Sequence, residues 1–292
     1  MSAFTIKDLE NLSGIKAHTI RVWEQRYTFL APQRTETNIR YYCNEELQKL
    51  LNVALLNKYG YKISHIDRMT VAEMTEKILS LSQVEAQQER IVNELIHCMA
   101  DLKMEDFETI LDNYIKAKGI EKTITRILFP FLERIGILWL TAHINPAQEH
   151  LVSNIIRQKL IVGIDSVKSN SQSEKTLLLF LPEGEHHEMG LLFVHYLLKC
   201  KGLKVLYLGT NVPLKDVASV ASLKDPDFLY THLTSCCQNF NFEKFLQHTH
   251  SSMPDRKVIV SGMLTQGYKK KIPANFSFKH SLSEVMGYIS SL

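Results

Sequence analysis

The apolar residues near the N-terminus recur with the spacing of two short helices followed by a hairpin. Thr5 is a suitable N-cap for a first helix, and the apolar face of that helix ends at Gly14. A second helix is expected from about Ala17 to Tyr27. The polar segment after Pro32 then predicts a loop, with a short strand returning in the sequence IRYY. This order of elements predicts a helix-turn-helix with a wing.

Helical spacing continues from Asn44 and gives way to a stretch rich in Glu and Gln, at about 71–88, which we expect to be a linker. Beyond it, apolar residues recur at helical spacing in four segments between Ile91 and Ile156. Four helices with short connections predict a bundle. The apolar seam at 84–102 is shorter than the roughly three heptads that a coiled coil needs, so self-association is expected further along the chain.

The last part of the chain alternates short apolar runs with helical segments. The runs suit strands that are buried on both faces, and their order predicts a doubly wound parallel sheet. In such sheets ligands lie beyond the carboxyl ends of the strands. The predicted strands are 176–182, 203–209, 228–233 and 257–262.

With 292 residues, 45% of them hydrophobic, the chain can bury the cores of two or three domains. We expect a multidomain α and α/β protein: a winged helix-turn-helix at 1–75, a four-helix bundle at 83–168 and the sheet domain at 174–292. An uncharged apolar run of about 18 residues is missing, and so is a signal-peptide pattern. We therefore expect a cytoplasmic protein without a membrane span. Five cysteines without C-x-x-C spacing indicate neither a disulfide framework nor a zinc ribbon.

Basic residues gather in the winged region, although the net charge of the whole chain is only +3. Guanidinium groups suit DNA phosphates and guanine edges, and tyrosine hydroxyls can add contacts to the DNA backbone. A solvated basic hairpin explains the same charges, so composition leaves both interpretations open. The candidates for contact with DNA are Arg21, Arg26, Arg34, Arg40, Tyr41 and Tyr42.

The sequence TIRVWEQRY at 19–27, together with the Arg-Tyr pair of the wing, resembles the winged helix-turn-helix of the MerR family of transcription regulators. The resemblance covers roughly residues 4–68. It implies a double-stranded DNA operator as partner, and it adds Trp23 to the DNA-facing positions. Trp23 equally suits a packing role between the helices.

Two adjacent histidines follow the first predicted strand, in the sequence PEGEHHEMG at 182–190. A histidine with a carboxylate two positions earlier suits a metal ligand whose second ring nitrogen the acid orients, here His187 and Glu185. Gly190 would allow a bulky group to approach the start of the next helix. A hydrated loop explains the same residue types, and a zinc site lacks a third ligand at suitable spacing.

The pattern Glu185-x-His187-x-x-Gly190 resembles the D/E-x-H-x-x-G motif of cobalamin-binding domains, whose histidine coordinates cobalt. Upstream, Trp139 followed by Glu149-His150 resembles the W-x9-EH signature of light-responsive repressors of the CarH and LitR type. The resemblance implies a Rossmann- or flavodoxin-like domain that binds adenosylcobalamin, with His187 below the cobalt and Trp139 above it. It also implies a homo-oligomer, either a dimer or a tetramer. A core tryptophan and a helix-surface histidine would explain the upstream residues equally well.

The sequence departs from that family where the nucleotide tail of the cofactor would lie. A Ser-x-Leu motif on the third strand is replaced by Thr231-His232-Leu233, and a Gly-Gly pair on the fourth by Ser261-Gly262. We expect the β-branch of Thr231 and the Cβ of Ser261 to crowd this pocket. Leu140 stands where some light sensors have a histidine, which argues against a second histidine ligand after light.

Three functions remain to be compared. The first is a transcription regulator, a repressor, whose C-terminal module senses adenosylcobalamin and light. The second is the same regulator with a degenerate sensor that binds another ligand or a protein partner, or serves only in oligomerisation. The third is a corrinoid enzyme, against which the DNA reader and the absence of a substrate barrel argue. We therefore expect a regulator and not an enzyme.

Overall fold

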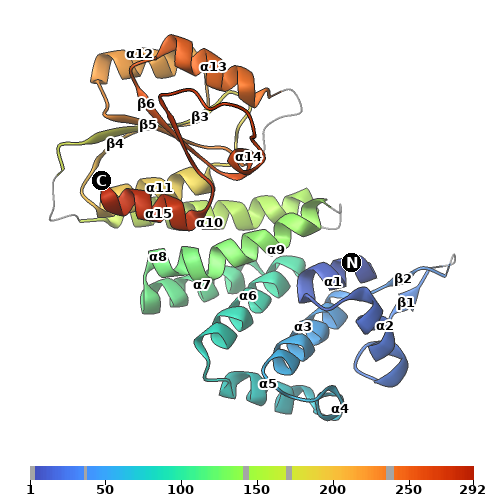
Figure 1. Ribbon diagram of the computed structural model, residues 1–292. Coiled ribbons are helices and arrows are strands. Elements are labelled where there is room, and N and C mark those ends of the chain that lie inside the picture. Colours follow the sequence, from blue (N-terminus) through green and yellow to red (C-terminus); the bar gives the residue numbers. More distant parts are fainter. Residues whose placement is uncertain (1–3, 36–37, 141–144, 169–172, 235–239) are drawn as a thin grey trace. The chain divides into compact units, whose positions relative to one another are not determined.

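The chain folds as two compact units, residues 1–155 and 156–292, and the division between them falls within helix α10 (Pro146–Ser166). None of the helices in the described residues has the length and apolar character needed to cross a membrane. The structure is a computed structural model and describes residues 4–35, 38–140, 145–168, 173–234 and 240–292 (Figure 1).

The N-terminal unit begins with the predicted winged helix-turn-helix. Thr5 and Asp8 form a reciprocal capping box that starts the first helix, and Gly14 ends it in the left-handed conformation with φ 73°. The hairpin returns antiparallel, as the sequence predicts. The elements are α1 (Ile6–Ser13), α2 (Ala17–Arg26), β1 (Gln33–Arg34) and β2 (Arg40–Tyr41).

The predicted four-helix bundle follows three connecting helices. Its third helix is α8, which continues through the π-helical segment η1 into α9 (Figure 1). The bounds are α3 (Asn44–Lys58), α4 (Ile63–Ile66), α5 (Val71–Ser80), α6 (Val84–Ala100), α7 (Met104–Lys118), α8 (Ile120–Thr123), η1 (Ile124–Leu128) and α9 (Phe129–Leu140).

The segment predicted as a polar linker is instead the helix α5. Thr70 and Glu73 cap it reciprocally, and Met74 and Ile78 are buried on one face. Helix α5 packs on α3, and α3 packs on α6, so the winged region and the bundle share one compact unit. The linker prediction was wrong because two apolar residues four apart suffice to bury one face of a helix.

The C-terminal unit contains the predicted parallel sheet, with five strands in the order β4-β3-β5-β6-β7. Four strands agree with the predicted runs. The fifth is absent from the prediction because its sequence FSFK is short and alternates polar with apolar residues. The bounds are β3 (Thr176–Pro182), β4 (Lys204–Val212), β5 (Phe228–His232), β6 (Lys257–Ser261) and β7 (Phe276–Lys279).

Helices cover both faces of the sheet (Figure 1). One face carries α11 (Met189–Cys200) and α15 (Leu282–Ser291). The other carries α12 (Leu214–Lys224) and α13 (Phe242–Ser252), and a short helix, α14 (Met263–Gln266), follows β6.

Side chains alternate between the two faces along β5. Leu229 and Leu233 belong to the apolar core with α12 and α13. Phe228, by contrast, packs edge-on against Tyr288 of α15, with ring centroids 6.3 Å apart. Tyr230 and His232 therefore lie on the face of α11 and α15.

Candidate functional site

The loop at residues 183–188 lies where the strand order of the sheet reverses. Strand β3 pairs with β4 on one side and with β5 on the other, so the connections that follow β3 and β5 diverge. In sheets of this kind a crevice forms beyond the carboxyl ends of the strands at the reversal. The histidine loop therefore occupies the position at which a ligand is expected.

Glu185 is fully buried in this loop and orients His187. Its Oε1 accepts hydrogen bonds from the backbone N–H groups of His186 and His187, both at 2.9 Å, and lies 2.6 Å from Nδ1 of His187. Its Oε2 accepts a bond from the backbone N–H of Thr234 at 3.1 Å. When Nδ1 of His187 donates to this carboxylate, Nε2 is the acceptor atom of the ring, which is the arrangement of a metal-ligating histidine.

The charge of Glu185 follows from its partners. Burial by itself would raise the pKa of this carboxyl, but the hydrogen bonds from His187 and Thr234 outweigh burial and lower the pKa below its ordinary value. The carboxylate is therefore ionised near neutral pH, whereas 49% of the His187 side chain is exposed. The carboxylate of Glu185 is fully buried, so the loop is not simply a hydrated surface loop.

Further contacts hold the loop in place. Glu188 accepts a hydrogen bond from the hydroxyl of Tyr207 at 2.8 Å and pairs with Arg157 of α10 at 2.7 Å. The side-chain oxygen of Asn211 accepts a bond from the backbone of Gly184 at 3.0 Å. Arg157, Tyr207 and Asn211 are not among the site residues that the sequence predicts. Tyr207 and Asn211 lie around the end of the second predicted strand, and this position is the signal that could have identified them as site residues.

The space beside Gly190 is filled by a side chain of the protein itself. The ring of His232 lies so close to α11 that a Cβ on Gly190 would fall 2.4 Å from its Cδ2. Nδ1 of His232 lies 2.8 Å from Oγ of Ser261, and that Oγ lies 2.6 Å from the hydroxyl of Tyr230. In this structure the space beside Gly190, predicted to admit a bulky group, holds the ring of His232.

Two other predicted cofactor positions have structural roles. Thr231 lies on the α12 face of β5, and its buried hydroxyl has no hydrogen-bond partner within the described part of the chain. Gly262 has φ 100°, and a Cβ there would lie 2.3 Å from the carbonyl oxygen of Leu233. Thr231 lies on the opposite face of β5 from His232, and its predicted crowding of the tail pocket stays a prediction.

The predicted residues above the cofactor lie in the N-terminal unit, and His187 lies in the C-terminal unit. Nδ1 of His150 is 3.4 Å from Oε2 of Glu149, and 72% of the His150 side chain is exposed. Glu149 also accepts a hydrogen bond from Ser153. Trp139 and Leu140 fall in α9, but their side chains lie outside the described residues, so their roles stay predictions.

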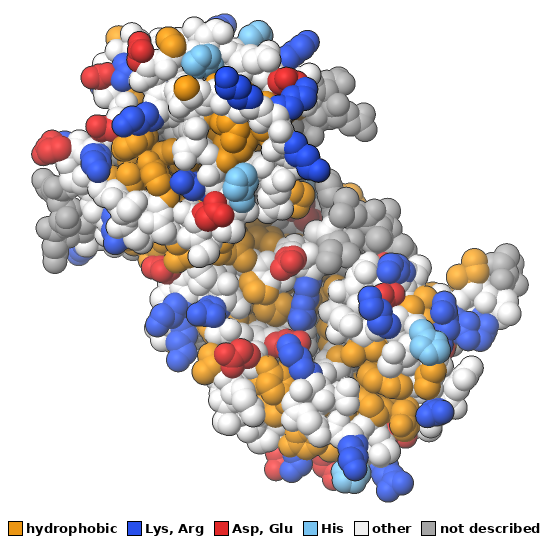
Figure 2. Space-filling model, viewed as in Figure 1, with side chains coloured by type: hydrophobic (Ala, Val, Ile, Leu, Met, Phe, Trp, Pro, Cys, Tyr) orange, Lys and Arg blue, Asp and Glu red, His pale blue; other side chains and the backbone are white. Residues whose placement is uncertain are grey.

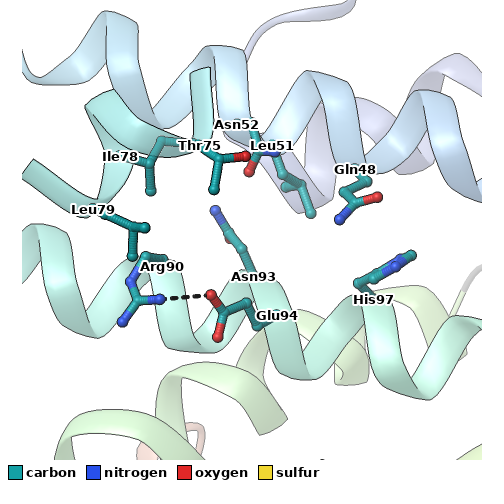
Figure 3. A pocket seen from close by; sticks show the side chains of 10 residues that line it. All are labelled: Gln48, Leu51, Asn52, Thr75, Ile78, Leu79, Arg90, Asn93, Glu94 and His97. Atoms are coloured by element: carbon teal, nitrogen blue, oxygen red, sulfur yellow. Dashed lines mark hydrogen bonds and ion pairs between the residues drawn. The ribbon is translucent and has the colours of Figure 1, made fainter. Parts of the chain in front are cut away.

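A polar pocket of about 130 Å³ lies within the N-terminal unit between α3, α5 and α6 (Figure 3). Arg90, Asn93, Glu94 and His97 line it from α6, and Arg90 pairs with Glu94 at 2.8 Å. None of the predicted site residues contributes to its lining. The ion pair is formed within one helix and indicates no particular ligand.

The basic candidates of the winged region differ in exposure. Arg21 and Arg26 are exposed on α2, and Figure 2 shows Lys and Arg side chains over this part of the surface. Arg34 is exposed on the wing and donates to Oδ1 of Asn38 at 2.7 Å. Arg40 pairs with Glu24 of α2 at 3.0 Å, while Tyr41 is partly exposed.

Trp23 and Tyr42 are core residues. Trp23 is 8% exposed, and its ring packs edge-on against Phe29 with the centroids 5.9 Å apart. Tyr42 is fully buried, its hydroxyl donates to Glu24, and burial raises its pKa well above the ordinary value. The direct contacts with DNA predicted for these two side chains do not fit their burial.

Two family models match the chain. The model of the MerR HTH family of regulatory proteins matches residues 4–73, and a model of a B12 binding domain matches residues 91–162. Residues 4–73 therefore match the MerR family of helix-turn-helix regulators, which implies binding to DNA, and residues 91–162 match a B12 binding domain. The chain belongs with transcription regulators and not with enzymes, as the sequence predicts.

Two curated relatives are similar to the chain over most of their length. The HTH-type transcriptional repressor CarA of Myxococcus xanthus is 28% identical over 281 residues, which cover 96% of this chain and 92% of the relative. The HTH-type transcriptional repressor CarH of the same organism is 26% identical over 257 residues, covering 86% and 85%.

A solved structure supports the fold alone. The monomethylamine corrinoid protein of Methanosarcina barkeri superposes with a TM-score of 0.53 at 15% identity. The match covers 70% of this chain and all of the other.

Proposed function

We propose that this chain is a cytoplasmic transcriptional repressor whose binding to a DNA operator is controlled by a corrinoid, with adenosylcobalamin as the first ligand to test. The buried Glu185 and the half-exposed His187 carry the proposal. An ionised carboxylate that accepts from Nδ1 of a histidine selects the tautomer in which Nε2 can bind a metal. The B12-binding domain at 91–162 supports the choice of cobalt over zinc.

The residues fit the cobalt-bearing macrocycle of such a cofactor but not its bulky lower substituent. His187, oriented by Glu185, would hold the cobalt of such a cofactor, and Trp139, Glu149 and His150 are the further residues that the resemblance assigns to it. When bound, the cofactor would supply the cobalt centre and a photolabile cobalt–carbon bond. The crevice beside Gly190, in contrast, is already occupied by His232, so it does not fit a bulky lower substituent in this conformation.

The DNA-binding part of the proposal rests on α2 and the wing. Arg21, Arg26 and Arg34 are exposed there and suit phosphate contacts and base edges. A regulator of this size reads an operator most effectively as a two-fold assembly, so we propose a homodimer or a tetramer and a near-palindromic operator.

Equilibrium dialysis in the dark tests the corrinoid site directly. Adenosylcobalamin and adenosylcobinamide, which has no nucleotide, are offered to the wild type, His187→Ala and His186→Ala. Binding of at least one corrinoid should be lost in His187→Ala and kept in His186→Ala, because His186 is exposed and it is the ring of His187 that Glu185 orients. Equal loss in both variants would reject the specific role of His187.

Gel-shift titrations then connect the ligand to DNA. DNA fragments selected from a random pool are titrated with protein in the dark, with and without the corrinoid, and again after illumination. A change in affinity with the corrinoid supports control by the ligand, and a further change on illumination supports light sensing. An unchanged affinity together with corrinoid binding would favour a sensor domain that serves only in assembly.

A further inference from the structure

The ends of β3 and β5 border the crevice that is expected where the strand order reverses. The loop that carries Glu185 and His187 leaves the end of β3, and His232 is the last residue of β5, the next strand in the sheet. Because the connections diverge at this point, a ligand bound at His187 would extend any lower substituent between these two strand ends. His232 stands directly on that route.

His232 fills the crevice rather than bordering it. Its ring atoms Cδ2, Nε2 and Cε1 would lie 2.4, 2.5 and 3.0 Å from a Cβ built on Gly190, so the ring is packed against the start of α11. The ring is anchored through Nδ1 to Ser261, which in turn bonds to Tyr230. Ser261 and Tyr230 are both 1% exposed. The anchor is therefore part of the protein core.

The backbone around His232 leaves little room to widen the crevice. Gly262, at the end of β6, would place a Cβ 2.3 Å from the carbonyl oxygen of Leu233, so the chain segments after β5 and β6 are already in contact. The backbone N–H of Leu233 also donates to the carbonyl oxygen of Ser261 at 2.8 Å. A substituent can enter only if the His232 side chain itself moves away.

We propose that His232 closes the lower crevice, so that this chain favours a corrinoid without a nucleotide tail over complete cobalamin. The inference rests on the proposed function, because it requires a corrinoid at His187. The half-exposed His187 remains accessible to a flat macrocycle, whereas a nucleotide must displace the His232 ring and break its hydrogen bond to Ser261. His232 thus determines ligand specificity.

The test compares two ligands in full-length protein in the dark. Adenosylcobinamide and adenosylcobalamin are offered by equilibrium dialysis to the wild type, His232→Gly and Ser261→Ala. The wild type should bind adenosylcobinamide at least tenfold more tightly. His232→Gly should raise the affinity for adenosylcobalamin at least tenfold and leave adenosylcobinamide nearly unchanged, and Ser261→Ala should act in the same direction but less strongly.

Two controls separate a crevice effect from a general loss of packing. His195→Ala removes another partly buried histidine of the same unit, which stacks on Tyr207 with centroids 5.1 Å apart, and it should leave the preference between ligands unchanged. Free imidazole should raise the melting temperature of His232→Gly and not that of the wild type, because it refills the space that the ring has left.

The outcomes distinguish this inference from the proposed function. Equal wild-type affinity for both ligands, unchanged in His232→Gly, overturns the role of His232 and leaves the corrinoid function standing. Binding of cobalamin by His232→Gly, when the wild type binds neither corrinoid, supports the role of His232 and refutes corrinoid sensing by the natural chain. Failure of every variant to bind either ligand refutes the proposed function, and the ligand preference with it.

Discussion

Nε of Arg157 in α10 lies 2.7 Å from Oε2 of Glu188, the residue that follows His187. The hydroxyl of Tyr207 donates to the other oxygen of the same carboxylate. Glu188 therefore connects the histidine loop to β4 and to the helix that continues into the bundle.

Arg157→Ala should weaken corrinoid binding severalfold with little change in melting temperature. The Arg157 side chain is 51% exposed, so the ion pair contributes at most about 1 kcal/mol to stability. Its loss nevertheless releases one of the contacts that position the Glu188 side chain. Dialysis and thermal melting measure both quantities, and Arg157→Lys should restore part of the affinity. A large drop in melting temperature with unchanged affinity would mean that the pair is only structural.

Glu185→Gln should reduce the affinity for a corrinoid by roughly 10- to 100-fold, the range for losing the partner that orients a ligating histidine. The amide keeps the size of the side chain but removes the negative charge that Nδ1 of His187 contacts. Glu183→Gln is the matched control, because Glu183 is exposed in the same loop. Equal affinities of the two variants would contradict the orienting role of Glu185.

Arg21→Ala and Arg26→Ala should each weaken binding to the selected DNA and reduce its dependence on salt. A lost phosphate contact lowers the slope of log affinity against log salt by about 0.9, because one fewer counterion is released. Lys118→Ala, an exposed change on α7, should leave the slope unaltered. Unchanged slopes in both arginine variants would place the DNA elsewhere.

Glu24→Ala should destabilise the N-terminal unit by about 1–3 kcal/mol, because it leaves the buried hydroxyl of Tyr42 without its partner. The change also frees Arg40, so the wing loses its link to α2. Tyr42→Phe removes both the hydroxyl and its need for a partner and should cost less, about 1 kcal/mol. Urea unfolding measures the order of the two variants, and the reverse order would refute this account. Tyr41→Phe serves as the partly exposed control.

Stability should fall as the pH drops from about 6.5 to 4. Burial, opposed by Glu185 and reinforced by His187, lowers the pKa of His232 from 6.5 to about 4. The unfolded chain then binds a proton that the folded chain excludes, so the stabilisation is complete above pH 6.5 and is lost towards pH 4. At 1.36 kcal/mol per unit the loss is at most roughly 3 kcal/mol.

Urea midpoints across this pH range check the effect of His232. His232→Gln should flatten the profile in part, and His195, whose pKa burial also lowers to about 4, accounts for part of the remainder. His248→Gln, at an exposed position, should keep the wild-type profile. A profile in His232→Gln identical to that of the wild type would contradict the prediction.

The histidine loop shows which contacts can be predicted from residues that are close in the sequence. The spacing of Glu185 and His187 correctly predicts that the carboxylate orients the ring, because two residues in one tight loop are close in any conformation of that loop. The same reasoning failed for Tyr42. Its neighbours in space come from other elements, because Tyr42 meets Glu24 only after the wing has folded back on α2.

The sequence by itself determined the helices, four of the five strands, the order of the elements and the motifs of the family. These follow from caps, from apolar periods and from residue types within short segments. Only the tertiary structure decided that 71–80 joins the core, that Trp23 and Tyr42 are buried and that His232 fills the crevice beside Gly190. The reason is physical: burial and close contact depend on which distant segments meet, and β5, β6 and α11 meet only when the sheet is assembled.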